Sequence, residues 1–109
     1  MLENQIKQLW ELHGPIDLWA SEELAAQDIM KNQDMLAPCR TWVSGRRKLK
    51  APNTSKTTYG WKHDAENAIG QWVPHSIFIL ACFLEGVTLK PAGKDGDVWV
   101  FFTNIGQPS

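Results

Sequence analysis

The stretch IFILACFL at residues 77–84 decides the fold of this chain, with Pro74 before it and Gly86 after it. All eight residues are apolar, so a helix formed from them is apolar on every side and is expected to be buried on most sides. A bilayer span takes about 20 such residues, so this run is too short to cross a membrane. We therefore expect a buried central helix over about residues 74–85, with the core built around it.

Helical patterns continue on the N-terminal side of this run. Apolar residues recur at three- and four-residue steps, and Ser21 is an expected N-cap with two acidic residues in the first turn after it. The predicted helices cover about residues 2–13, 21–31, 38–44, 58–69 and 74–85. Lys62 and Glu66 lie one turn apart on the fourth of these and are expected to form a solvated surface pair.

Near the C-terminus, the spacing of apolar residues changes from a helical to a strand-like pattern. Residues 87–90 and 97–102 are rich in Val, Phe and Trp, and the turn-forming segment 91–96 separates them, which indicates a β-hairpin. Residues 44–57 carry Gly, Pro, Asn and Ser and are expected to form a flexible loop. The predicted fold class is α+β, mainly α, with about five helices around the central helix and a C-terminal β-hairpin, in a single domain of 109 residues.

Cysteine and histidine usage gives no sign of a metal or redox site. Cys39 and Cys82 lack metal-ligand spacing with each other and with the three histidines, so neither a metal nor a cofactor is expected. The first 20 residues lack the features of a secretory signal, so we expect a cytoplasmic protein with reduced, buried thiols. The six tryptophans are interpreted mainly as core residues, and one or two are left open as exposed anchors.

Charge is segregated along the chain. Residues 1–37 carry seven acidic residues against two lysines, and residues 38–63 carry seven basic residues and no acidic ones. Residues 64–109 return to a net charge of −3, so the total of −1 hides a basic band. Such a band either attracts an anionic partner or pairs with the chain's own acidic helices, and the sequence leaves both alternatives open.

The segment from Tyr59 to Glu66 spells Y-G-x-K-H-x-x-E, followed by a glycine turn and an apolar helix. Over residues 40–87 the chain resembles a group of small, mostly uncharacterised phage and mobile-element proteins with this pattern. That group tends to have a small polar pair before the last helix, where this chain has Pro74 and His75. The resemblance implies a mobile-element origin and an accessory task, such as transcription control or blocking a host defence system.

Two other functional interpretations are weaker. The pattern helix–glycine turn–helix over residues 59–85 suggests a helix-turn-helix, but a recognition helix needs polar side chains for base edges, and only His75 and Ser76 could serve. No enzyme is predicted, because His63 and Asp64 point about 100° apart on a helix and neither cysteine lies in a nucleophile motif. A hydrogen bond from His63 to Glu66 is expected only to tether a surface histidine.

The basic segment is the stronger candidate for binding. Its Lys and Arg residues with neighbouring Ser, Thr and Asn suit phosphate contacts, whereas the near-neutral total charge is unusual for a dedicated nucleic-acid binder. The main hypothesis is a non-catalytic accessory protein that binds a host protein or nucleoprotein complex and inhibits or modulates it, for example as an anti-CRISPR-like inhibitor. The alternative is a DNA-binding transcriptional regulator that uses the basic segment and the 59–85 helix pair. The predicted partner-binding residues are Arg40, Arg46, Arg47, Lys48, Lys50, Lys56, Lys62 and His63.

Overall fold

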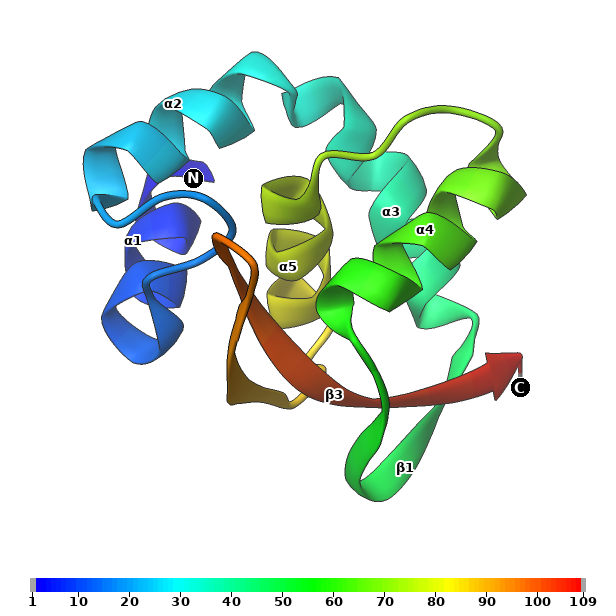
Figure 1. Cartoon of the computed structure of the whole chain (residues 1–109). Helices are drawn as coiled ribbons and strands as arrows, with labels where there is room; N and C mark the ends of the chain where they lie inside the picture. Colours follow the sequence, from blue (N-terminus) through cyan, green and yellow to red (C-terminus); the bar gives the residue numbers. More distant parts are fainter. Residues whose placement is uncertain (1, 109) are drawn as a thin grey trace.

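Five α-helices and three β-strands make up the fold within residues 2–108, the part of the chain that the computed structural model describes (Figure 1). The helices are α1 (Leu2–His13), α2 (Glu22–Lys31), α3 (Leu36–Ser44), α4 (Thr58–Ile69) and α5 (His75–Leu84), and the short 3-10 helix η1 (Gln33–Met35) precedes α3. The strands are β1 (Arg46–Thr57), β2 (Leu89–Asp95) and β3 (Val98–Pro108).

Local sequence signals explain several helix ends. The predicted N-cap Ser21 is confirmed, because its hydroxyl accepts a hydrogen bond from the backbone N–H of Leu24 at 3.3 Å. Helix α4 ends at Gly70, whose φ of 83° lies in the left-handed region that glycine adopts without a steric penalty. These two signals fix the start of α2 and the turn between α4 and α5.

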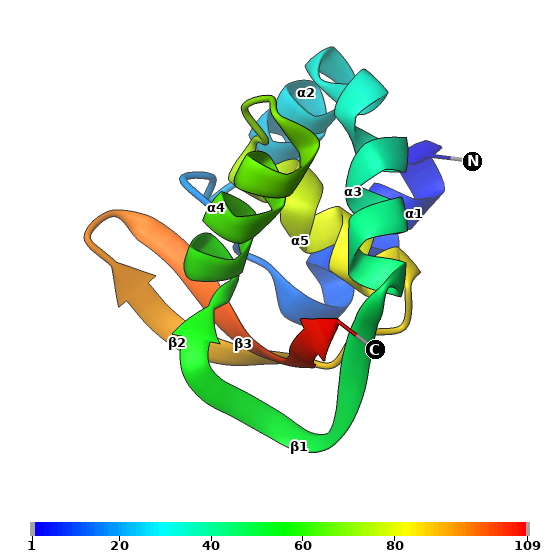
Figure 2. The same cartoon turned by 90° about the vertical axis from the view of Figure 1, so that its right-hand side faces the viewer.

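The sheet shows that the predicted fold class was wrong. Strand β3 is central and pairs antiparallel with both β1 and β2, so the strands form a three-stranded sheet in the order β1-β3-β2 and not a C-terminal hairpin (Figure 2). The segment expected to be a flexible loop, residues 44–57, contains the whole of β1. The physical reason is that β3 would otherwise expose a long row of unpaired backbone groups, which a second neighbouring strand satisfies.

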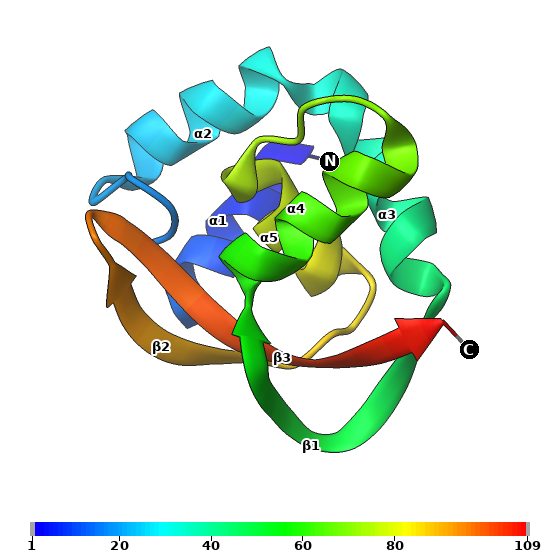
Figure 3. The same ribbon diagram turned by 45° about the vertical axis from the view of Figure 1, so that its right-hand side comes forward.

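Strand β1 pairs with β3 irregularly and curves away from it. From the pair Lys48–Ile105 to the pair Asn53–Thr103, β1 advances five residues while β3 advances only two. Bulges of this kind bend a strand, and an edge strand also tolerates Pro52, which cannot donate to a ladder. The outcome is a projecting curve, residues 47–56, which we call the β1 arch (Figure 3).

The core is shared among all the helices and the sheet. Residues 75–82 of α5 are buried, and they pack with buried residues of every other helix and of β3. Core side chains outside α5 include Ile6, Leu9, Ile29, Val43, Phe101 and Ile105. The prediction of a core built around one buried central helix was therefore wrong, because the helices and the sheet each contribute an apolar face.

The tryptophans divide between core and surface. Trp61 is buried, and the core also includes partly buried tryptophans of α1 and α3. Trp72, between α4 and α5, is 66% exposed. The alternative that one tryptophan serves as a surface anchor therefore concerns Trp72. Within residues 2–108, none of the helices combines the length and the apolar character that a membrane crossing requires.

Candidate functional site

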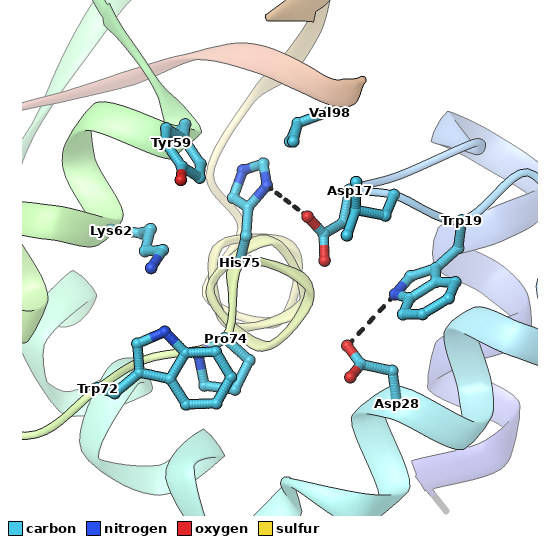
Figure 4. A pocket seen from close by; sticks show the side chains of 10 residues that line it. Asp17, Trp19, Asp28, Tyr59, Lys62, Trp72, Pro74, His75 and Val98 are labelled. Carbon is cyan, nitrogen blue, oxygen red and sulfur yellow. Dashed lines mark hydrogen bonds and ion pairs between the residues drawn. The ribbon is translucent and has the colours of Figure 1, made fainter. Parts of the chain in front are cut away.

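A pocket of about 270 Å³ opens between α2, α4 and the start of α5 (Figure 4). Its walls combine aromatic rings with charged groups, including two carboxylates from Asp17 and Asp28 and the ammonium group of Lys62. His75 and the exposed ring of Trp72 also line it. These side chains come from four separate parts of the chain, so only the folded protein brings them together.

A hydrogen-bonded chain runs from Asp17 through His75 to Thr58 behind the pocket wall. His75 Nδ1 lies 3.2 Å from Asp17 Oδ1, and His75 Nε2 lies 2.8 Å from Thr58 Oγ1. The backbone N–H of Phe101 donates to the same Thr58 oxygen at 3.2 Å. A neutral His75 satisfies the whole chain, because its Nδ1–H donates to the carboxylate of Asp17 and its Nε2 accepts a hydrogen bond from the Thr58 hydroxyl.

This order of carboxylate, imidazole and hydroxyl resembles that of a catalytic triad, but the burial of the hydroxyl argues against nucleophilic chemistry. Thr58 is fully buried, and its oxygen already accepts the Phe101 N–H. A nucleophile has to reach a substrate atom, and this oxygen is enclosed by the protein. The chain therefore holds the carboxylate of Asp17 and the ring of His75 in place at the pocket.

Backbone conformation also fixes Asp17. Its φ of 52° lies in the left-handed region, which Asp adopts more readily than most residues. Two backbone hydrogen bonds with Trp99 hold it there, from Asp17 N–H to Trp99 O at 3.1 Å and from Trp99 N–H to Asp17 O at 2.7 Å. The start of β3 thus positions the loop between α1 and α2 against α5.

Side-chain hydrogen bonds hold the carboxylate of Asp28, a residue of α2, in place. Its Oδ2 accepts hydrogen bonds from Trp19 Nε1 at 3.3 Å and from the hydroxyl of Ser76. Its Oδ1 accepts from Asn32 Nδ2 at 3.3 Å. These contacts join α2 to the start of α5 and hold a second carboxylate at the pocket.

The residues of the Y-G-x-K-H-x-x-E pattern form one cluster on α4. Lys62 donates to Glu66 Oε1, which also accepts the Val73 N–H at 3.2 Å, and His63 Nδ1 lies 3.1 Å from Glu66 Oε2. Burial raises the pKa of Glu66, but these hydrogen bonds outweigh it, so its pKa is lowered overall. The exposed, tethered His63 is confirmed, whereas the solvated Lys62–Glu66 pair is wrong, because Lys62 is only 5% exposed.

Most of the predicted partner-binding cations have partners within the chain. Arg40 pairs with Glu85 at 2.7 Å, and Lys56 pairs with Asp64. Arg40, Lys56 and Lys62 are therefore each paired with an acidic residue of the chain, and none is an unpaired surface charge for a partner. None of the ion pairs described in residues 2–108 links the basic band to an acidic residue of α1 or α2.

Two further cations support the start of β1. Lys48 Nζ donates to the carbonyl oxygens of Val43 at 3.0 Å and Arg46 at 3.2 Å, next to the C-terminal end of α3. The guanidinium carbon of Arg46 lies 4.3 Å from the ring centroid of Trp42. Arg47 and Lys50 remain: both are exposed on the β1 arch, and neither has an ion pair among residues 2–108.

The two cysteines lie in the core as inert thiols. Burial, with a smaller effect of Glu66, raises the pKa of Cys39 to about 12, and burial likewise raises the pKa of Cys82. A protonated thiol is neither a good nucleophile nor a metal ligand. Among residues 2–108, no three His, Cys, Asp or Glu side chains gather as a metal site would require.

Sequence reasoning did not identify Asp17, Asp28, Thr58 or Trp72 as members of a site. One signal was present, because Asp17 is an isolated carboxylate between the apolar Ile16 and Leu18 just after a Gly-Pro pair. Its pairing with His75, 58 residues later, depends on tertiary packing and has no sequence signature. Comparisons of the chain with protein-family models, curated proteins and solved structures give no match.

Proposed function

We propose that this protein is a non-catalytic accessory protein of mobile-element type that docks through the β1 arch on an anionic face of a host protein or nucleoprotein complex. Docking inhibits or modulates that complex. The observation that carries the proposal is the pair Arg47 and Lys50, two exposed cations without an ion pair among residues 2–108. Buried thiols without a disulfide fit action in the reducing cytoplasm, which is part of the proposal.

The shape of the arch favours side-chain contacts over strand addition. Edge strands recruit other strands when they are flat and regularly hydrogen-bonded, and bulges and proline suppress this. Strand β1 has register shifts along its whole length and carries Pro52 at the projecting part. A partner therefore meets the charged side chains and the neighbouring Thr54 and Ser55, which suit anionic groups.

The structure gives less support to the helix-turn-helix form of the DNA-binding alternative. Residues 75–82 of α5 are buried, including His75 and Ser76, the two positions that could have reached a base. A helix in this position has no face to place in a major groove. DNA binding by the arch alone would use phosphate contacts, and its affinity would fall steeply with salt.

The test uses the double variant Arg47→Ser/Lys50→Ser in the full chain. The matched control, Lys7→Ser/Lys90→Ser, removes the same charge from exposed lysines of α1 and β2. Host proteins captured by wild-type protein are identified, and the binding of each purified candidate is measured with all three proteins. We expect wild type and control to bind alike and the arch variant to bind at least about tenfold more weakly.

Two results would contradict the proposal. Equal binding by the arch variant and the control would show that the arch is not the docking surface. Binding to random duplex DNA as tight as binding to the purified partner, with a steep loss of affinity between 50 and 200 mM salt, would instead support the DNA-binding alternative.

A further inference from the structure

The pocket between α2, α4 and α5 presents hydrogen-bond donors on one side and acceptors on the other. Figure 4 shows the Lys62 ammonium group and the Tyr59 hydroxyl facing the carboxylates of Asp17 and Asp28 across the opening. Among residues 2–108, Asp17 Oδ2 and the Tyr59 hydroxyl have no protein hydrogen-bond partner. Both groups are thus available to a bound molecule.

The charges of the pocket select against an anionic ligand. Lys62 Nζ lies 5.5 Å from the ring centroid of Tyr59 and 5.7 Å from that of Trp72, so both rings already have a cation near them. Glu66 balances the charge of Lys62, so the carboxylates of Asp17 and Asp28 dominate the pocket and repel an anion. A neutral molecule with both donors and acceptors avoids this repulsion and can hydrogen-bond to groups on both sides of the pocket.

The exposed ring of Trp72 adds a stacking surface at the mouth of the pocket. This side chain is 66% exposed, although a tryptophan usually buries most of its large apolar surface. The volume of about 270 Å³ is just below the range of about 300–1,000 Å³ for drug-sized ligands, which fits one small ring system. A flat ring can stack on the indole while its edge reaches the polar groups inside.

We propose that this pocket binds a nucleobase. A base is neutral and flat, its exocyclic amine can donate to Asp17 or Asp28, and its ring nitrogen or carbonyl can accept from Lys62 or Tyr59. The same chemistry is presented by a free nucleoside and by an unstacked base of a single strand. Phosphates stay outside, because the carboxylates disfavour them. This site is separate from the β1 arch, so its test is independent of the proposed docking function.

The test follows the indole N–H resonance of Trp72 in ¹⁵N-labelled full-length protein. The four ribonucleosides, a short single-stranded oligonucleotide, the matching duplex, glucose and arginine are each titrated into wild type. We expect saturable shifts with at least one nucleoside or with the single strand, and none with the duplex, glucose or arginine. Tighter binding of the single strand than of any nucleoside would identify the strand as the source of the base.

Variants assign the binding to the pocket. Trp72→Leu removes an exposed ring, so the fold is retained, and it should weaken binding at least about fivefold through lost stacking. Because Trp72→Leu lacks the indole N–H probe, its affinity is measured by isothermal titration calorimetry. Tyr59→Phe removes only the pocket hydroxyl and should weaken binding more modestly. Leu12→Ala, an exposed residue on α1, is the control and should bind like wild type.

Three results would overturn the proposal. The first is a Trp72 resonance that stays unmoved by every nucleoside and by the single strand at millimolar concentration. The second is a shift with glucose or arginine while the nucleosides have no effect. The third is an affinity of Trp72→Leu equal to that of Leu12→Ala.

Discussion

The α4 cluster and the β1 arch both draw on the same basic band, but they place its charges in opposite environments. On α4, Lys62 is 5% exposed and its charge is balanced by Glu66. On the arch, Arg47 and Lys50 are exposed and have no ion pair among residues 2–108. A run of positive charge in a sequence therefore does not equal a binding surface, because folding assigns some of the charges to structure and leaves others for a partner.

The largest effect is expected in the core that supports both regions. Leu80→Ala should lower the free energy of unfolding by about 2–5 kcal/mol, because Leu80 is fully buried and its truncation leaves a cavity. Leu12→Ala, on an exposed site, should change it by less than about 0.5 kcal/mol. Urea unfolding measures both. An equal midpoint for the two variants would mean that Leu80 does not contribute to the shared core.

Glu66→Gln should have the next largest effect, and the effect should depend on pH. At pH 7 the loss of the carboxylate that binds Lys62, His63 and the Val73 N–H should cost about 1.5–3 kcal/mol. The pKa of Glu66 is lowered from 4.5 in the folded protein, so its stabilising contribution is present above about pH 4.5 and is lost as the pH falls through the lowered value.

Unfolding of wild type and Glu66→Gln from pH 7 to pH 3 measures this difference. We expect the gap between the two proteins to narrow below about pH 4.5. A gap that stays constant over this range would mean that the ionised carboxylate does not stabilise the α4 cluster.

Thr58→Val should be somewhat milder, and it tests the buried hydrogen-bonded chain. Valine keeps the shape but leaves His75 Nε2 and the Phe101 N–H without their partner, at a cost of about 1–3 kcal/mol. Thr58→Ser keeps the hydroxyl and serves as the control. Thermal unfolding of both variants gives the comparison, and a valine variant as stable as the serine variant would show that this chain does not help to hold Asp17.

The smallest effect on stability is expected at the arch. Arg47→Ser/Lys50→Ser should change the free energy of unfolding by less than about 1 kcal/mol, because exposed charges without an ion pair contribute little to the fold. Thermal unfolding of the variant beside Lys7→Ser/Lys90→Ser measures this. A loss of several degrees relative to the control would identify these cations as structural, like Lys62.

Local signals predicted the helices better than the sheet. Ser21 and Gly70 act within a few residues, so the N-cap and the helix end could be inferred from the sequence. The pairing of β1 with β3 joins residues about 50 positions apart, such as Asn53 and Thr103, and the loop-like composition of β1 concealed it. An edge strand with bulges tolerates such residues, which is why composition alone indicated a loop.

The candidate sites were predictable in part. The sequence identified the basic band and the Y-G-x-K-H-x-x-E pattern, but it could not separate Arg47 and Lys50 from the cations with intramolecular partners. Arg40 shows why, because its partner Glu85 is 45 residues away and is adjacent only in the folded chain. The pocket was missed for the same reason, since Asp17 and His75 meet only through tertiary packing.

Whether Arg47 and Lys50 of the β1 arch steer docking is best measured by the association rate constant of the arch variant with its purified partner. Charges that steer an encounter act mainly on this rate, by roughly tenfold or more at low ionic strength, and salt screens the effect. We expect Arg47→Ser/Lys50→Ser to associate at least about tenfold more slowly than Lys7→Ser/Lys90→Ser in low salt, and the difference to shrink in high salt. Equal association rates for the two variants at low salt would show that Arg47 and Lys50 do not steer docking.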